Sequence, residues 1–195
     1  MDKKTEQLRK MRDSIVDCQK CPLYKTRILP VIGQGNHNAK AIFIGEAPGA
    51  TEDKTGVPFC GAAGRILSEL LESIDCKRED IYIANILKCR PPTNRNPLQN
   101  EIDACVGYLE EQIKIIQPKV ICPMGNYAVN FILRNFGLGD EIQGISKIHG
   151  KLFESDTELG KLKIAPLYHP AVSVYNANMK DVLKKDFQLL KGLIS

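Results

Sequence analysis

A run of four apolar residues, Ala41-Ile42-Phe43-Ile44, leads directly into the glycine-rich sequence Gly45-Glu46-Ala47-Pro48-Gly49. This pattern indicates a short buried strand that ends in a loop, and the loop continues into a helical pattern over residues 66–74. In a parallel sheet such a loop lies at the carboxyl edge, where ligands bind close to helix N-termini. Glycines allow the backbone of this loop to approach a ligand closely. A tight strand-to-helix connection without a ligand is the alternative interpretation.

Apolar runs elsewhere in the chain predict three more strands, at residues 81–84, 120–125 and 163–167. Apolar residues at helical spacing predict further helices, at residues 5–17, 98–116, 126–136 and 180–193. Asn96-Pro97 is a suitable helix start, with asparagine as the N-cap and proline at the first helical position. Residues 151–153 predict one arm of a small hairpin. Because strands and helices alternate, we expect one α/β domain over residues 1–195 with four parallel strands.

The composition is that of a globular chain, with 26% charged and 43% apolar residues among 195. No apolar run approaches the ~20 residues that a membrane-spanning helix needs. The first ten residues are charged throughout, so they do not resemble a secretory signal, and we expect a cytoplasmic protein. The net charge of +4 permits binding to nucleic acid but does not require it.

Seven cysteines are many for a chain expected in a reducing compartment, where structural disulfides are disfavoured. Grouped cysteines therefore indicate metal or cluster ligation, although ordinary thiols are the alternative. The predicted N-terminal helix stops at a C-x-x-C turn, a spacing that brings two thiolates to one metal or cluster edge. We group four cysteines as candidate ligands: Cys18, Cys21, Cys89 and Cys105. Three others lack a partner at ligand spacing and are expected to be free thiols: Cys60, Cys76 and Cys122.

Polar side chains follow three of the predicted strands at their carboxyl ends, namely Glu46, Asn85 and His169. Because parallel strands end at one edge of a sheet, these side chains should converge, with Phe59 in the adjoining loop. A single histidine is often only a core or surface residue, but three convergent polar groups favour a site.

The loop after the second predicted strand carries Lys88, Arg90 and Arg95 with no acidic residue between them. Such a patch suits contacts with phosphate, which need positive charge and exposed donors. A solvated basic loop without a ligand is the alternative.

Three motifs together resemble those of the family 4 uracil-DNA glycosylases. They are the block from Gly45 to Gly61, the stretch Asn85-Ile86-Leu87-Lys88-Cys89-Arg90-Pro91-Pro92, and His169-Pro170-Ala171. The resemblance extends from Cys18 to the last helix, and Cys60 is one departure, since family members usually carry an aliphatic residue there. It implies a three-layer α/β/α fold around a four-stranded parallel sheet. It also implies a [4Fe-4S] cluster on the four grouped cysteines, for which zinc is the competing metal.

The activity implied by the resemblance is hydrolysis of the N-glycosidic bond of deoxyuridine in DNA, after the base has been flipped out of the stack. By the same resemblance, Phe59 stacks on the uracil and the amide of Asn85 reads its edge. We further expect His169, which resembles the motif histidine of the family, to stabilise the negative charge on the leaving base. We expect Glu46 to position water or stabilise the cationic sugar, and backbone N–H groups near Ala47 to contact the base.

The segment that follows the histidine motif, residues 172–176, is expected to form a loop. Val172 and Val174 are its candidates for a wedge that fills the gap left by the flipped base, and core packing of these valines is an equally good interpretation.

Two other functions stay open at this point: a protein that traps uracil-DNA covalently, and a cluster-bearing DNA-binding module without catalysis. The absence of histidine between Asn85 and Cys105 favours turnover over covalent trapping. We expect a monomer that acts on uracil-containing DNA. Partners such as a sliding clamp or other repair proteins are left open by the sequence.

Overall fold

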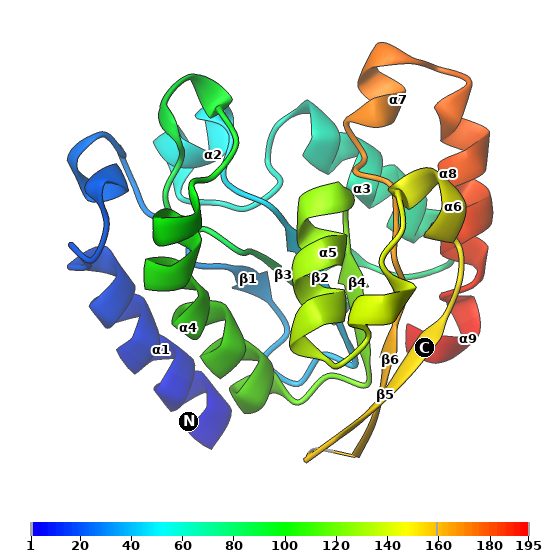
Figure 1. The fold of residues 1–195 in the computed structure, drawn as a ribbon, viewed down its shortest axis with the longest axis horizontal. Helices are drawn as coiled ribbons and strands as arrows, with labels where there is room; N and C mark the ends of the chain where they lie inside the picture. Colours follow the sequence, from blue (N-terminus) through cyan, green and yellow to red (C-terminus); the bar gives the residue numbers. More distant parts are fainter. Residues whose placement is uncertain (1, 159, 195) are drawn as a thin grey trace.

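In the computed structural model, which describes residues 2–158 and 160–194, six strands form one mixed sheet with helices on both faces (Figure 1). The strands are β1 (Gln34–Gly35), β2 (Ala41–Gly45), β3 (Tyr82–Asn85), β4 (Val120–Pro123), β5 (Phe153–Thr157) and β6 (Gly160–Ile164). The helices are α1 (Lys3–Val16), α2 (Ala50–Thr55), α3 (Ala62–Glu72), α4 (Gln99–Ile116), α5 (Asn126–Asn135), α6 (Ile145–Ile148), α7 (Val172–Tyr175), α8 (Met179–Gln188) and α9 (Lys191–Ile194). None of these helices has the length and apolar character needed to cross a membrane.

The strand order is β1-β3-β2-β4-β6-β5, and its four central strands run parallel to one another. The predicted α/β fold with a parallel four-stranded core is therefore confirmed. Two antiparallel edge strands extend it: β1 pairs with β3, and β5 pairs with β6 in the expected hairpin. The last parallel strand lies three residues earlier than predicted, and its continuation is a single bridge between Met124 and Leu167.

Alternating side chains of the central strands pack on opposite faces, which produces the three layers. Ile42 and Ile44 of β2 pack in a core with helices α1, α4 and α5. Ala41 and Phe43 of the same strand pack in a second core with α3 and α8. Every residue of β2 is buried, as expected for a central strand covered on both faces.

Three local predictions were wrong. Helix α4 begins at Gln99 with Leu98 as its N-cap, so Asn96 does not cap it. The buried carboxylate of Glu101 sets this start, because it accepts the Leu98 N–H at 2.9 Å. Residues 172–175 form the short helix α7 instead of a loop, and the C-terminal helix is divided into α8 and α9.

Candidate active site

The carboxyl ends of the parallel strands surround a pocket of about 410 Å³. It is lined by Glu46 and Ala47 after β2, by Asn85 at the end of β3, by His169 after β6, and by Phe59. The expected convergence of these side chains is thus confirmed, because the topology ends β2, β3 and β6 at the same edge. Figure 1 shows this end of the sheet beneath the segments that carry α2 and α7.

Asn85 is the most unusual residue of the pocket, because its amide is buried without a partner. The residue is only 1% exposed, and neither Nδ2 nor Oδ1 has a hydrogen-bond partner. It lies opposite Gly45 in the pairing of β2 and β3. A Cβ atom at Gly45 would lie 2.4 Å from Oδ1 of Asn85 and 2.9 Å from the Phe59 ring, so glycine is needed there. Since an unpaired buried amide is costly, this group is suited to a ligand that supplies its partners.

His169 is held in one tautomer by its own backbone. The N–H of Ala171 donates to Nδ1 at 3.2 Å, so the neutral ring carries its proton on Nε2. Burial lowers the pKa of His169 to about 4, and the charge of Glu52 opposes this shift only in part. The ring lies 5.5 Å, centroid to centroid, from that of Phe59. A neutral imidazole that offers Nε2–H therefore faces the aromatic wall of the pocket.

Phe59 adopts a left-handed backbone conformation, with φ of 50°, which is rare for a bulky residue. Gly64 permits it, since a Cβ there would lie 1.7 Å from the Phe59 carbonyl oxygen. Arg78 donates a hydrogen bond to the carbonyl of Pro58, directly before the strained residue. Phe59 as a whole is only 7% exposed.

Glu52 organises the same loop, and the sequence patterns did not assign it a role. One of its carboxylate oxygens accepts the backbone N–H groups of Cys60 at 3.0 Å and Gly61 at 2.9 Å. These donors lie at the N-terminal end of α3, where a carboxylate is favoured. The sequence signal that could have indicated this role is an acidic residue a few positions before a glycine-rich helix start.

Glu46 is the first residue after β2 and is half-buried in the pocket wall. Burial raises the pKa of its carboxyl group above the ordinary value of 4.5. Its backbone is fixed, because the Leu87 N–H donates to the Glu46 carbonyl at 3.0 Å. A carboxylate with a raised pKa suits proton transfer to or from water.

The three basic residues predicted to contact phosphate have different positions. The prediction for Lys88 was wrong: the residue is 1% exposed, with Nζ bound to the Asn85 carbonyl and to Gln112. Burial lowers the pKa of Lys88 to about 8. Arg90 is half-buried and donates to Asn94 at 2.7 Å.

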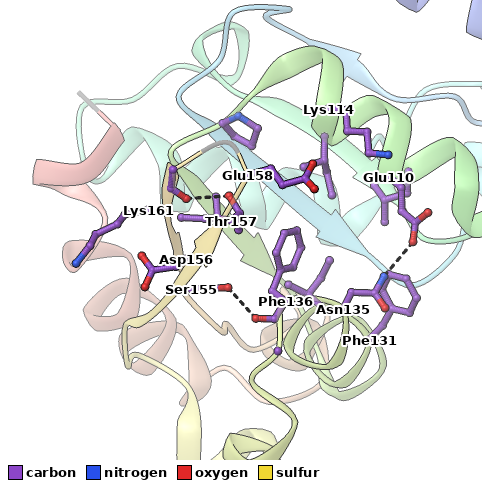
Figure 2. A pocket seen from close by; sticks show the side chains of 17 residues that line it. Glu110, Lys114, Phe131, Asn135, Phe136, Ser155, Asp156, Thr157, Glu158 and Lys161 are labelled. Carbon is purple, nitrogen blue, oxygen red and sulfur yellow. Dashed lines mark hydrogen bonds between the residues drawn. The ribbon is translucent and has the colours of Figure 1, made fainter.

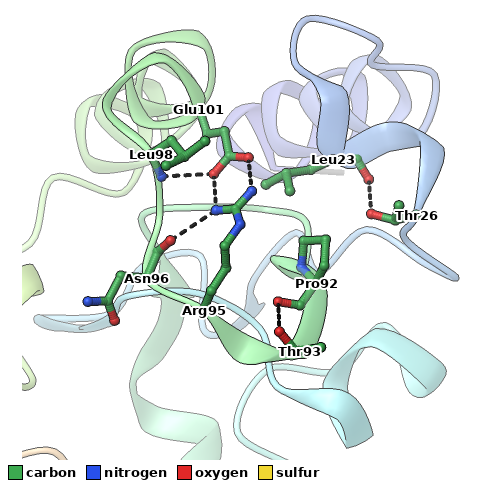
Figure 3. Close-up of polar contacts among 8 residues, drawn as sticks. All are labelled: Leu23, Thr26, Pro92, Thr93, Arg95, Asn96, Leu98 and Glu101. Atoms are coloured by element: carbon green, nitrogen blue, oxygen red, sulfur yellow. Dashed lines mark hydrogen bonds and ion pairs between the residues drawn. The ribbon is translucent and has the colours of Figure 1, made fainter.

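Arg95 lines the mouth of the pocket and is held by Glu101. Its two terminal nitrogens donate to the two carboxylate oxygens at 2.9 and 2.6 Å, as Figure 3 shows. The carboxylate is 1% exposed, whereas the Arg95 side chain is 37% exposed. The pair therefore fixes a partly accessible guanidinium beside the pocket.

The four grouped cysteines lie close to one another, and the sulfur of Cys18 is near enough to affect the pKa of Cys21 and Cys89. Cys89 and Cys105 are buried in a small core with Leu23, and Cys21 packs against it. Both buried sulfurs accept hydrogen bonds at 3.2 Å: Cys89 from Arg27 Nη1, and Cys105 from the Lys88 backbone N–H. Burial raises the pKa of both thiols, to about 11 for Cys105.

No three potential ligands among residues 2–158 and 160–194 converge closely enough to hold a single metal ion. All seven cysteines are free of disulfide bonds, including the three that were expected to be free thiols.

The two wedge candidates differ in accessibility. Val172 packs against the core that contains α3 and α8, in agreement with the packing interpretation. Val174 is 46% exposed on α7, and its neighbour Tyr175 is 89% exposed. Sequence reasoning did not single out Tyr175.

A larger cavity of about 980 Å³ lies between the C-terminal parts of α4 and α5 and the β5–β6 hairpin (Figure 2). It contains none of the predicted site residues. Two of its polar side chains bond within the protein: Ser155 donates to the Phe136 carbonyl at 2.7 Å, and Asn135 donates to Glu110 at 3.3 Å. Size alone therefore does not mark this cavity as a site.

Comparison with known proteins agrees with the geometry. Residues 32–191 match the Uracil DNA glycosylase superfamily. Type-4 uracil-DNA glycosylase from Archaeoglobus fulgidus is 44% identical over 92% of this chain and 89% of its own. Those from Sulfurisphaera tokodaii and Saccharolobus solfataricus are 38% and 40% identical, over 96% and 94% of this chain and 85% and 84% of theirs. The chain therefore belongs to the uracil-DNA glycosylase superfamily, among the type-4 uracil-DNA glycosylases.

Proposed function

We propose that this protein removes uracil from DNA by hydrolysing the N-glycosidic bond, which releases free uracil and leaves an abasic site. The observation that carries the proposal is the buried, unpaired amide of Asn85 in a pocket shared with Glu46, Phe59 and His169. The pocket lies inside the protein surface, so the target nucleotide must first leave the base stack.

Recognition of the base is assigned to Asn85 and Phe59. A side-chain amide offers one acceptor and two donors, which match N3–H and O4 of uracil. Cytosine presents an acceptor at N3 and a donor at N4, so it would leave the buried amide mispaired. The ring of Phe59, held in its strained loop, provides the face on which the base stacks.

Departure of the base is assigned to His169. The C1′–N1 bond breaks, and its electron pair leaves with uracil as an anion. Because Nδ1 of His169 accepts the Ala171 N–H, Nε2–H is the proton available to donate to uracil O2 as its negative charge grows. The lowered pKa keeps this ring neutral, so it stabilises the anion as a hydrogen-bond donor.

Attack of water on the cationic sugar is assigned to Glu46. Its carboxylate orients a water molecule whose oxygen forms the new bond to C1′, and it accepts the proton that the water loses. The negative charge also stabilises the oxocarbenium character of the sugar. The raised pKa of Glu46 makes it a stronger base than an exposed glutamate.

Cys18, Cys21, Cys89 and Cys105 are proposed to hold a [4Fe-4S] cluster. Two of these sulfurs already accept N–H groups, Cys89 from Arg27 Nη1 and Cys105 from the Lys88 backbone N–H, as thiolate ligands of a cluster do. When bound, it would supply a structural cross-link between the N-terminal segment and the loop after β3.

Contacts with the DNA backbone are proposed for Arg90 and Arg95, and insertion into the duplex for Val174 on α7. Arg95 lines the pocket mouth, and Val174 is exposed at the same end of the sheet. Since one chain supplies every residue of the pocket, a monomer suffices for the activity.

One assay tests the activity. A uracil-containing oligonucleotide is incubated with the protein, the abasic product is cleaved with alkali, and a denaturing gel is run. Free uracil with a cleaved strand is expected. A stable protein–DNA adduct would indicate covalent trapping, and binding without uracil release would indicate a module without catalysis. For the cofactor, iron and sulfide analysis with visible absorbance is decisive, and a colourless protein with one zinc would overturn the cluster assignment.

A further inference from the structure

Lys88 is a buried cation directly beneath the residue assigned to read the base. Its side chain folds back by three residues, and Nζ donates to the Asn85 carbonyl at 2.9 Å and to Gln112 Oε1 at 2.7 Å. Gln112 on α4 is completely buried and is fixed in turn: its amide nitrogen donates to the Ile32 carbonyl at 2.7 Å and to the Tyr82 hydroxyl at 3.2 Å. A chain of hydrogen bonds thus runs from α4 to the last residue of β3.

The Asn85 amide has no protein partner to fix its direction, so its aim depends on the backbone that carries it. Asn85 is the last residue of β3, and the next two residues still donate to the Gly45 and Glu46 carbonyls, each at 3.0 Å. The carbonyl of Asn85 itself accepts from Lys88 Nζ. A buried ammonium whose acceptors are neutral oxygens is costly, because no opposite charge compensates for its loss of water. An apolar residue would be cheaper if only packing were needed at position 88.

We propose that Lys88 is a positioning residue for base recognition. Its ammonium holds the Asn85 carbonyl, with Gln112 as its anchor on α4, and so fixes the direction in which the Asn85 amide meets uracil. This inference rests on the proposed role of Asn85. The competing role follows from sequence position, since Lys88 precedes Cys89 and its backbone N–H bonds to Cys105. In that case the lysine would position the cysteines of the proposed cluster and not the Asn85 amide.

A double-mutant cycle separates these roles. Lys88→Met retains length and removes the charge, and Asn85→Ala removes the amide. Single-turnover release of uracil is measured for both variants and their combination, with visible absorbance to confirm that the cluster content is unchanged. Lys88→Met alone should lower the rate by about 10- to 100-fold, as expected for a misplaced reading group. In the Asn85→Ala background the same change should have almost no further effect.

If the rate losses of the two single variants multiplied in the double variant, the inference would be overturned, because Lys88 would then act through a group other than Asn85. A wild-type rate for Asn85→Ala alone would instead refute the role of Asn85 itself, so the two failures are distinguishable. Selectivity provides a second readout that a purely structural role would not move: Lys88→Met should reduce the preference for uracil over cytosine.

Gln112→Met keeps the charge of Lys88 but removes its anchor, and it decides the question if Lys88→Met does not fold. It should show a smaller loss of rate and selectivity, again absent in the Asn85→Ala background. Lys114→Met, at an exposed position two residues along α4, is the matched control and should match the wild type. Unaltered selectivity in Gln112→Met would count against the inference.

Discussion

The two ends of the sheet carry cavities that differ in size and in the state of their polar groups. The pocket at the carboxyl edge has about 410 Å³ and contains a buried amide without partners. The cavity at the β5–β6 hairpin has about 980 Å³, but Ser155 and Asn135 already bond within the protein. The difference teaches that an unmet hydrogen-bonding requirement identifies a site better than volume does. Substitutions at the first end should change chemistry, and substitutions at the second should change only stability.

The largest effect is expected for Glu46→Gln. The amide cannot accept a proton from water or stabilise a cationic sugar, so single-turnover excision should fall by about 10²- to 10⁴-fold. Glu110→Gln, at the opposite cavity, is the matched control and should excise uracil at the wild-type rate. A near-normal rate for Glu46→Gln would remove this carboxylate from the mechanism.

His169→Ala should lower excision by about 10²- to 10³-fold, because the developing uracil anion loses its Nε2–H donor. The measurement is again the single-turnover rate, with binding to uracil-DNA measured separately. His37→Gln serves as a control, since burial also lowers the pKa of His37 but its ring lies against Thr5, away from the pocket. Equal losses in both variants would point to general destabilisation.

Asn85→Asp should alter selection more than rate. A carboxylate accepts but does not donate, so it loses the match to uracil O4 and can accept from cytosine N4. The ratio of uracil to cytosine excision should fall by about ten- to a hundredfold, the discrimination that a bidentate base contact provides. Competition between the two oligonucleotides measures it, and an unchanged ratio would contradict the assignment of this amide.

The pH dependence should follow Glu46. Burial raises its pKa above 4.5, so the active carboxylate is lost on acidification at a higher pH than for an exposed glutamate. Excision should then fall by about tenfold per pH unit below that pKa. His169, with a pKa lowered to about 4, is still neutral where this limb begins and becomes protonated only at lower pH. If the excision rate of Glu46→Gln fell in the same way at acidic pH, that fall would belong to another titratable group.

The sequence was sufficient for the sheet core and for the convergence of Glu46, Asn85 and His169, because apolar runs and strand ends are local signals. The sequence did not predict that Lys88 is buried. Its burial depends on a hydrogen bond to Gln112, which is distant in sequence on α4. The prediction of where α4 begins was wrong for a similar reason. Asn96-Pro97 has good local capping chemistry, but the buried Glu101 takes the Leu98 N–H and fixes the helix later.

The smallest effect on excision is expected for Ser155→Ala in the larger cavity. Its hydroxyl donates to the Phe136 carbonyl at 2.7 Å, and the alanine would leave that acceptor without this donor. The free energy of unfolding should fall by about 1 to 3 kcal/mol, measured by denaturant titration. The single-turnover rate of the folded protein should not change, because this hydrogen bond is satisfied within the protein and takes no part in binding the base. If excision fell by more than the unfolded fraction explains, the two ends of the sheet would be coupled, and hydrogen-bond satisfaction would no longer separate them.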